Sequence, residues 1–194
     1  LKGVSFEVEK GKTLAIIGNT GSGKSTILEL IGRLYDVDRG TIDIDGEPIK
    51  TLNLNSLRSN IGFVPQDPFL FSDTLKNNIK FGNQNATDLE VIDAAKKAVV
   101  HENIINFKKG YDTILGERGI TLSGGQKQRV SIARAFIKKP QILLLDDCLS
   151  AVDTETEEQI LNNIELVTKN KPTIIVSHRI SSAKNADSIV VLND

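Results

Sequence analysis

The sequence of 194 residues has little of three things: cysteine, unbroken apolar stretches and excess charge. Cys148 is the only cysteine, which excludes a disulfide within the chain and suits a reducing compartment. No apolar run approaches the roughly eighteen residues that are needed to span a bilayer. Lysine and arginine number 24 against 25 acidic residues, so the bulk charge indicates no polyanionic partner such as nucleic acid. The length and the hydrophobic content of 39% suit one domain with a core.

Both ends of the sequence resemble the interior of a domain. It begins with Leu1-Lys2-Gly3-Val4 and stops at Val191-Leu192-Asn193-Asp194, and the first segment does not have the composition of a secretory signal. We therefore expect the chain to be a domain excised from a longer protein.

A glycine-rich segment near the N-terminus carries the most specific chemical signal. It fits the pattern G-x-x-x-x-G-K-[ST], follows the apolar run 14–17 and precedes the helix-like run 27–31. Glycines let backbone N–H groups approach phosphates closely, and a helix that starts near Lys24 points its positive end at them. Lys24 adds a positive charge for the outer phosphates, and the Ser25 hydroxyl can bind Mg²⁺. The sequence thus predicts an ATP site formed by Gly18, Asn19, Thr20, Gly21, Ser22, Gly23, Lys24, Ser25 and Thr26.

Apolar runs alternate with helical patterns along the chain. The runs 142–145, 173–176 and 188–192 predict strands, and 154–167 predicts an amphipathic helix. Ser123 is the expected N-cap of a helix that runs to about Lys139. Alternating residues at 4–8 and 41–46 predict antiparallel edge strands. The predicted fold class is α/β: a P-loop NTPase core with a mostly parallel central sheet, an antiparallel β edge subdomain and a small α-helical subdomain.

The character of the sequence changes between about residue 73 and residue 110. Apolar residues there fall at roughly helical spacing, with breaks rich in asparagine and glycine. We expect residues 1–72 and 111–194 to form the catalytic core with its β edge, and about 73–110 to form the helical subdomain.

A carboxylate follows the buried run 142–145. Asp146 should therefore lie at the carboxyl end of a central strand, where α/β sheets bind their ligands. It is suitably placed to bind Mg²⁺, directly or through water. An aspartate in this position can also simply cap the next helix, but the phosphate loop favours the metal.

A second glycine-containing helix start lies at Leu122-Ser123-Gly124-Gly125-Gln126. It has the features of another anion-binding helix N-terminus. One domain does not need two such sites for one nucleotide, so the segment is suited to the γ-phosphate of ATP bound to a second copy. With these motifs in this order, the chain resembles the nucleotide-binding domain of an ABC (ATP-binding cassette) protein over essentially its whole length.

This resemblance implies a role for each matching residue. Residues 18–26 match the Walker A loop, and Asp146 matches the Walker B aspartate. Gln66 matches the Q-loop glutamine, which senses Mg²⁺ and faces the transmembrane coupling region. His178 matches the switch histidine, which contacts the γ-phosphate and steadies the attacking water. The implied magnesium ligands are Ser25, Gln66 and Asp146, and the implied catalytic residues are Lys24, Gln66, Asp147 and His178.

Further motifs of the family imply contacts with a partner domain. Ser123, Gly124, Gly125 and Gln126 match the signature, which contacts the partner's ATP. Asp153 ends the D-loop at 150–153, which lies across the dimer seam. The resemblance thus implies ATP and Mg²⁺ as cofactors and a second nucleotide-binding domain as a partner.

Two segments are similar to those of exporters whose membrane helices are on the same chain. One is 63–71 around Gln66, and the other is 113–119, where Glu117 is expected to touch a coupling helix of the membrane domain. An exposed turn is the plainer interpretation of the second segment. The exporter resemblance places the membrane helices and the adenine-stacking aromatic residue upstream of Leu1, and the domain at the cytoplasmic face of the cell membrane.

The chain departs from the exporter pattern at one position. Asp147 follows Asp146, where exporters have a glutamate that polarises the attacking water. Because aspartate is one methylene shorter, its carboxylate would lie about 1 Å from the required position, which can cost on the order of 10²-fold in rate. We expect a slow or degenerate ATP site in a heterodimer, with a slow homodimer as the alternative.

Two other functions compete with the exporter. A soluble ABC ATPase of DNA repair or translation is disfavoured, because the chain has no long heptad insertion and no basic cluster for nucleic acid. A regulatory module that binds nucleotide without turnover is favoured by Asp147 and disfavoured by His178.

Overall fold

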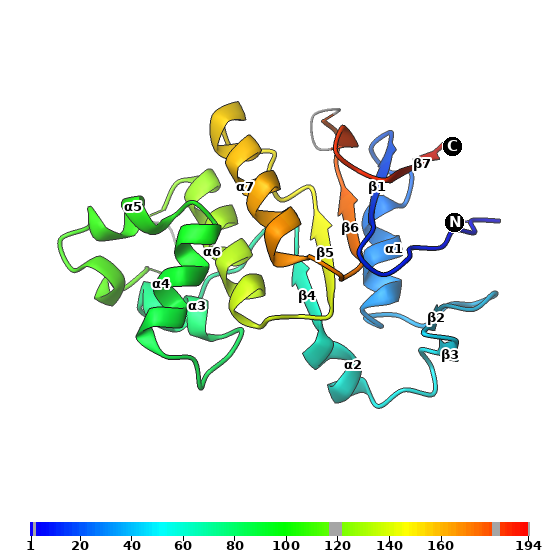
Figure 1. Cartoon of the computed structure of the whole chain (residues 1–194), viewed down its shortest axis with the longest axis horizontal. Coiled ribbons are helices and arrows are strands. Elements are labelled where there is room, and N and C mark those ends of the chain that lie inside the picture. The colour runs from blue at the N-terminus through cyan, green and yellow to red at the C-terminus, as the bar shows by residue number, and fades with distance from the viewer. Residues whose placement is uncertain (2, 117–121, 180–182, 194) are drawn as a thin grey trace.

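The computed structural model describes residues 1, 3–116, 122–179 and 183–193. Its centre is a parallel five-stranded sheet in the order β4-β5-β6-β1-β7 (Figure 1). The strands are β1 (Thr13–Gly18), β4 (Ile61–Val64), β5 (Ile142–Asp146), β6 (Thr173–Val176) and β7 (Ser188–Leu192). The predicted α/β fold with a parallel central sheet is confirmed.

The sheet separates two apolar cores. Side chains alternate along β5, so Leu143 and Leu145 belong to one core and Leu144 belongs to the other. The first core is covered by α6 (Gly124–Ile137) and α7 (Thr154–Val167), and the second by α1 (Lys24–Ile31) and α2 (Leu54–Asn60). Helices on both faces leave only the strand ends available for a ligand.

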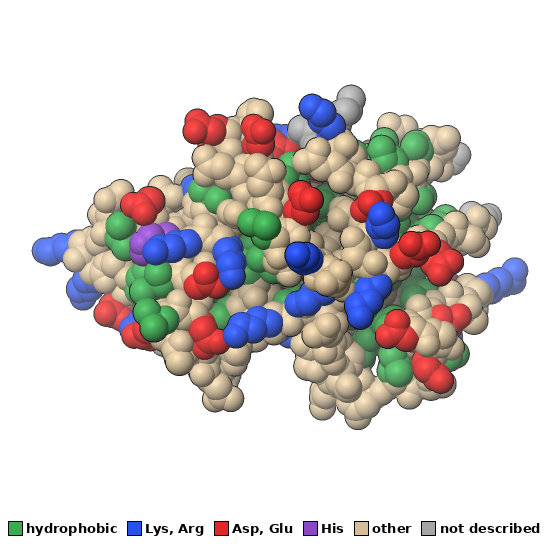
Figure 2. All heavy atoms as spheres, viewed as in Figure 1, with side chains coloured by type: hydrophobic (Ala, Val, Ile, Leu, Met, Phe, Trp, Pro, Cys, Tyr) green, Lys and Arg blue, Asp and Glu red, His purple; other side chains and the backbone are tan. Residues whose placement is uncertain are grey.

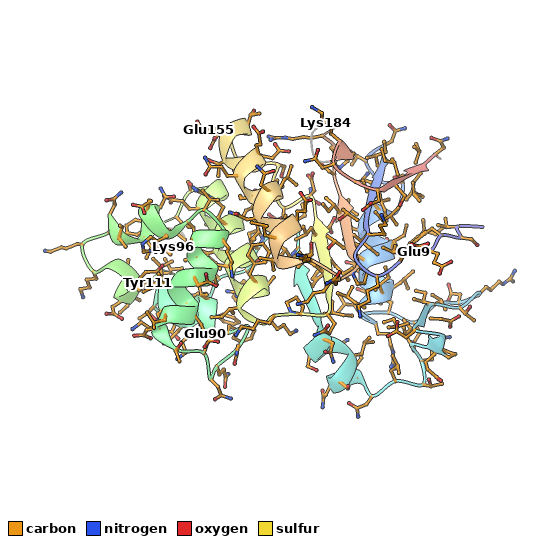
Figure 3. All side chains as sticks on the ribbon, viewed as in Figure 1. Glu9, Glu90, Lys96, Tyr111, Glu155 and Lys184 are labelled. Atoms are coloured by element: carbon orange, nitrogen blue, oxygen red, sulfur yellow. The ribbon has the colours of Figure 1, made fainter. Side chains whose placement is uncertain are left out.

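Short helices form the end of the molecule opposite the two termini (Figure 1). They are α3 (Leu75–Lys80), α4 (Asp88–Lys97), α5 (His101–Ile105) and the 3₁₀ helix η1 (Gly110–Asp112). Glu90, Lys96 and Tyr111 lie in this part, whereas Glu9 lies at the other end (Figure 3). The buried residues of α3, α4 and α5 join the core beneath α6. The segment of about 73–110 is therefore helical, as its spacing of apolar residues predicts.

Two sequence predictions concerned the antiparallel edge. A two-stranded sheet of β2 (Asp43–Ile44) and β3 (Glu47–Pro48) replaces the longer strand predicted at 41–46. The strand predicted at 4–8 is wrong, because the chain has no strand there. Alternation shows which side chains face water, but a strand also needs a neighbour for its backbone groups, and none of the described strands pairs with residues 4–8.

The helices on either side of β5 begin with side-chain caps. The Gln126 main-chain N–H donates to Ser123 Oγ at 3.2 Å, and the Ser123 N–H donates to Gln126 Oε1 at 3.0 Å, which is a reciprocal capping box. The predicted N-cap is thus confirmed, and α6 ends at Ile137, two residues earlier than expected. Helix α7 has the predicted bounds and is capped by Asp153.

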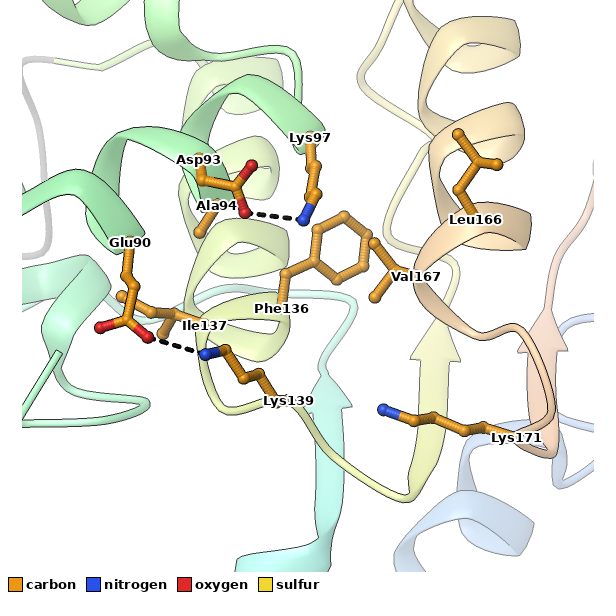
Figure 4. A pocket seen from close by; sticks show the side chains of 10 residues that line it. All are labelled: Glu90, Asp93, Ala94, Lys97, Phe136, Ile137, Lys139, Leu166, Val167 and Lys171. Atoms are coloured by element: carbon orange, nitrogen blue, oxygen red, sulfur yellow. Dashed lines mark hydrogen bonds and ion pairs between the residues drawn. The ribbon is translucent and has the colours of Figure 1, made fainter. Parts of the chain in front are cut away.

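A cavity of about 320 Å³ lies where α4, α6 and α7 meet (Figure 4). Lys139 and Lys171, which precede β5 and β6, also line it, so it lies toward the amino ends of these strands and not at their carboxyl ends. Phe136 lines it, and two ion pairs lie at its edge: Lys97 with Asp93 at 2.6 Å and Lys139 with Glu90 at 2.7 Å. On the face drawn in Figure 2, acidic and basic side chains are interspersed over the surface.

Candidate functional site

The phosphate loop connects β1 to α1, as predicted. Gly18 has a φ of 156°, and a Cβ there would lie 2.5 Å from the main-chain oxygen of Leu192, so a side chain does not fit. Gly23, at the start of α1, has a left-handed φ of 92°, which glycine adopts without strain. The loop conformation therefore depends on glycine at both ends.

The loop closes around its own lysine. Lys24 is 5% exposed, and its Nζ donates to the carbonyl oxygens of Gly18 at 2.9 Å and Asn19 at 2.7 Å. The Ser22 hydroxyl is buried and has no hydrogen-bond partner in the described part of the chain. A buried ammonium beside an unsatisfied hydroxyl and a helix N-terminus is suited to an anion such as a phosphate.

Ser25 and Asp146 lie in contact, although 121 residues separate them. The Ser25 Oγ donates to Asp146 Oδ1 at 3.0 Å, because α1 begins beside the carboxyl end of β5. Burial raises the pKa of Asp146 above its ordinary value, and the hydrogen bond from Ser25 opposes this. Two adjacent oxygen donors, one anionic, fit Mg²⁺, which takes few protein ligands and completes its shell with water and phosphate oxygens.

Asp147 and His178 follow neighbouring strands. The Asp147 N–H donates to the oxygen of Val176 at 2.9 Å, and Asp147 Oδ1 accepts from the main-chain N–H of His178 at 3.4 Å. Asp147 is 8% exposed with a left-handed φ of 42°, whereas the His178 side chain is exposed. The short carboxylate is therefore directed to the backbone of the segment 177–179 around His178, which we call the switch segment.

Gln66 follows β4 in the same way and is exposed. Because all five strands of the sheet are parallel, their carboxyl ends share one edge. The structure thus brings to one edge the phosphate loop, Gln66, Asp146, Asp147 and His178.

The signature segment contacts the D-loop instead of the phosphate loop. A Cβ on Gly125 would lie 2.7 Å from the Ala151 oxygen, so the two backbones approach closely only because residue 125 is glycine. Among the described residues, no hydrogen bond joins Ser123–Gln126 to residues 18–26. Asp153 caps α7 by accepting from the Thr156 N–H at 2.9 Å, and this bond lowers the pKa of its carboxyl. Glu117 lies outside the described residues.

An aromatic patch includes Phe69 and Phe71 of the segment 63–71, together with Phe81, whose contact with them the sequence did not predict. Phe69, Phe71 and Phe81 are 53%, 37% and 56% exposed, and the ring centroids of Phe71 and Phe81 are 4.7 Å apart. Arg134 packs against the rings of Phe71 and Phe81 and donates to the Phe69 oxygen at 2.8 Å. Burial lowers the pKa of Arg134 to about 10, so the side chain stays charged at neutral pH.

Comparison with known proteins identifies the family. The sequence model described as ABC transporter matches residues 1–150. The chain belongs to the ABC transporter family. It is 53% identical over 194 residues to ATP-binding cassette sub-family B member 6 of Xenopus tropicalis, covering 100% of this chain and 23% of the relative. It is 51% identical over 194 residues to a putative multidrug export ATP-binding/permease protein of Staphylococcus aureus, covering 100% of this chain and 34% of that protein.

A solved structure agrees with this assignment. A bacterial Atm1-family ABC exporter with ATP bound superposes with a TM-score of 0.95 at 47% identity, covering 98% of this chain and 33% of that one. The chain therefore spans about a quarter to a third of the relatives that it matches. Among the described residues, none of the helices combines the length and the apolar character that crossing a bilayer demands. The predicted resemblance to the nucleotide-binding domain of an ABC exporter is confirmed.

Proposed function

We propose that the chain is the ATP-hydrolysing domain of an ABC exporter, and that two such domains enclose ATP at a shared interface. The observation that carries this proposal is the contact of Ser25 with Asp146 beside a phosphate loop closed around Lys24. The relative that is solved with ATP bound supports the choice of nucleotide.

In this proposal each residue at the strand ends has a defined task. Lys24 exchanges its bonds to the loop carbonyls for bonds to the outer phosphates and neutralises their charge. Ser25 and Asp146, with Gln66, hold Mg²⁺, which when bound neutralises charge on the phosphates. Asp147 and His178 orient the attacking water, and Asp147 is the acceptor for its proton.

The signature segment serves the partner's ATP. Ser123, Gly124, Gly125 and Gln126 stand at the N-terminus of the 14-residue helix α6, whose first N–H groups suit a phosphate. Among the described residues, these four form no hydrogen bond to the phosphate loop, and Gly125 contacts the D-loop that ends at Asp153. Both observations favour a role across a dimer seam.

The remaining predictions concern the longer protein. We propose that its membrane helices lie upstream of Leu1, that its coupling helices contact the Gln66 region and Glu117, and that the domain lies at the cytoplasmic face of the cell membrane. The exposed aromatic patch of Phe69, Phe71 and Phe81, the first two of which closely follow Gln66 in the sequence, is suited to such a contact. We retain residues 1–72 and 111–194 as the core and about 73–110 as the helical subdomain.

We also propose that this chain's own site turns over slowly because Asp147 is shorter than glutamate, and that a different chain supplies the faster site. A nucleotide-binding module without turnover is the second candidate, favoured by the same residue. Release of inorganic phosphate by the assembled transporter, with and without its partner, distinguishes the two.

The test of the site itself is equilibrium ATP binding to the transporter that carries this domain. Lys24→Ala removes charge-assisted hydrogen bonds of about 1.5–3 kcal/mol, so ATP affinity should fall roughly 10- to 100-fold. Lys50→Ala is the matched control, because Lys50 is an exposed lysine that also donates to a main-chain carbonyl, that of Val37. Equal affinity of the Lys24→Ala variant and the unaltered protein would refute the proposed site.

A further inference from the structure

Two side chains from different segments form hydrogen bonds to the D-loop, residues 150–153. From the switch segment, Arg179 Nη2 donates to the Ser150 oxygen at 2.7 Å and Nη1 donates to the Val152 oxygen at 3.2 Å. The same guanidinium pairs with Glu157 Oε2 at 2.6 Å. One arginine thus joins the switch segment to the D-loop and to the first turn of α7.

Gln128, on α6, also binds the D-loop. Its Oε1 accepts from the Ala151 N–H at 3.1 Å, and its Nε2 donates to Ser150 Oγ at 3.3 Å. Gln128 is only 5% exposed, and Ser150 Oγ donates onward to the Asp147 oxygen at 2.9 Å. The D-loop is therefore also tied to the backbone of the residue that we propose to orient water.

These contacts connect parts of two different ATP sites. Arg179 directly follows His178, which in the proposed function faces the γ-phosphate of this chain's own ATP. Gln128 lies on α6, the helix whose N-terminus we assign to the partner's ATP. Between them the D-loop backbone touches Gly125 so closely that a Cβ would lie 2.7 Å from the Ala151 oxygen. A shift of the switch segment therefore has a short, hydrogen-bonded route to the signature segment.

We propose that Arg179 is a positioning residue that, together with Gln128, couples the switch histidine of one ATP site to the signature segment that completes the other. This inference rests on the proposed dimer. Arg179 contacts neither nucleotide. It fixes the D-loop relative to His178, so the contact of His178 with the γ-phosphate at one site sets the position of Gly125 at the other site.

The geometry requires a guanidinium in particular. Arginine presents a rigid planar fork, which here reaches two carbonyl oxygens and one carboxylate at once, whereas lysine presents a single flexible ammonium. The Glu157 side chain is 2% exposed and fixes the orientation of the fork. Replacing Arg179 by alanine would leave that buried carboxylate without its arginine and would disturb folding as well as coupling.

Arg179→Lys is therefore the informative variant, because it keeps a cation for Glu157 and loses the fork to the D-loop. Arg33→Lys is the matched control: Arg33 also donates to two carbonyls, those of Ile49 and Leu52, and also pairs with a carboxylate, but it lies beside the antiparallel edge. Both variants change the same group in the same kind of contact.

The experiment measures, in the assembled transporter, ATP affinity, kcat, the Hill coefficient for ATP and the urea midpoint of unfolding. For Arg179→Lys we expect kcat to fall about tenfold and the Hill coefficient to fall toward 1. ATP affinity should stay within about twofold of that of the unaltered protein, and the urea midpoint should not change within error. Arg33→Lys should change none of the four. An unchanged Hill coefficient, or a fall in kcat that is matched by a lower unfolding midpoint, would overturn the coupling role.

A double-variant cycle separates a shared route from two independent effects. If Arg179 and Gln128 act through one D-loop, Arg179→Lys should lower kcat little further in a Gln128→Ala background. Fully additive losses would contradict the inference. If the unaltered transporter neither hydrolyses ATP nor pairs its domains when ATP is added, the proposed function itself fails. If the unaltered transporter is active and the Arg179→Lys variant behaves like it, only the coupling role is refuted.

Discussion

Replacing Asp147 by glutamate tests whether reach limits hydrolysis at this chain's own site. Asp147 Oδ1 lies 3.4 Å from the main-chain nitrogen of His178, and the residue is almost fully buried at the end of β5. One added methylene would let the carboxylate reach beyond this backbone contact. The two carboxyl groups have similar intrinsic basicity, so the substitution changes position far more than proton affinity.

The size of the expected gain follows from that displacement. A misplacement of about 1 Å in a catalytic group can cost on the order of 10²-fold, so Asp147→Glu should raise the single-turnover rate by roughly 10- to 100-fold. A small loss of stability should accompany it. Asp147 has a left-handed φ of 42°, which aspartate tolerates better than glutamate, and the difference is about 1 kcal/mol or less.

The assay is single-turnover ATP hydrolysis by the assembled transporter, with urea unfolding measured in parallel. Asp45→Glu is the control for strain alone, because Asp45 is also left-handed, with a φ of 52°, but is exposed in the turn between β2 and β3. It should show a similar small stability change without any gain in rate. If Asp147→Glu leaves the rate at this site as it was, reach is not the defect and the degenerate-site hypothesis is wrong.

Two further substitutions test packing and charge. Gly125→Ala should destabilise the fold by about 1–3 kcal/mol in denaturant unfolding, because its Cβ would meet the Ala151 oxygen at 2.7 Å. Gly124→Ala is the control and should not destabilise the fold, because the nearest atom to its Cβ would be 3.5 Å away. Equal losses of stability in the two variants would contradict this packing argument. Glu90→Gln should lower stability at neutral pH. The hydrogen bond from Lys139, then those at the N-cap of α4, lower the pKa of Glu90 from 4.5 to about 2, so its contribution is present above pH 4.5 and is lost as the pH falls toward 2. The difference between the two proteins in urea midpoint should shrink across that window, and a difference independent of pH would refute the charge argument.

Sequence predicted the interior of the fold better than its edge. The run 142–145 is apolar at every position because the strand is buried on both faces, and Ser123 marks the start of α6 by its own capping chemistry. These signals are local. A strand at 4–8 depends on a partner strand, which alternation alone does not reveal, and that prediction failed.

The same distinction applies to the site. The order of the motifs along a parallel sheet predicts that Lys24, Asp146 and His178 share an edge, because each follows a strand. What sequence could not give is the D-loop attachment. Arg179 appears only as the residue after a histidine, and Gln128 only as one polar residue on a helix. Their shared contact with residues 150–152 joins positions that are 22 to 29 residues apart and depends on tertiary packing.

This attachment gives a reason why a short carboxylate at position 147 is compatible with function. In the proposed dimer, Asp147 governs the reaction at this chain's own ATP, whereas Arg179 and Gln128 govern how firmly this chain's signature segment meets the partner's ATP. The second task requires the D-loop bonds to the Ser150 and Val152 carbonyls, none of which involves the Asp147 carboxylate. A chain can therefore lose speed at one site and still complete the other, so the effects of Asp147→Glu and Arg179→Lys should appear at different sites of one assembly.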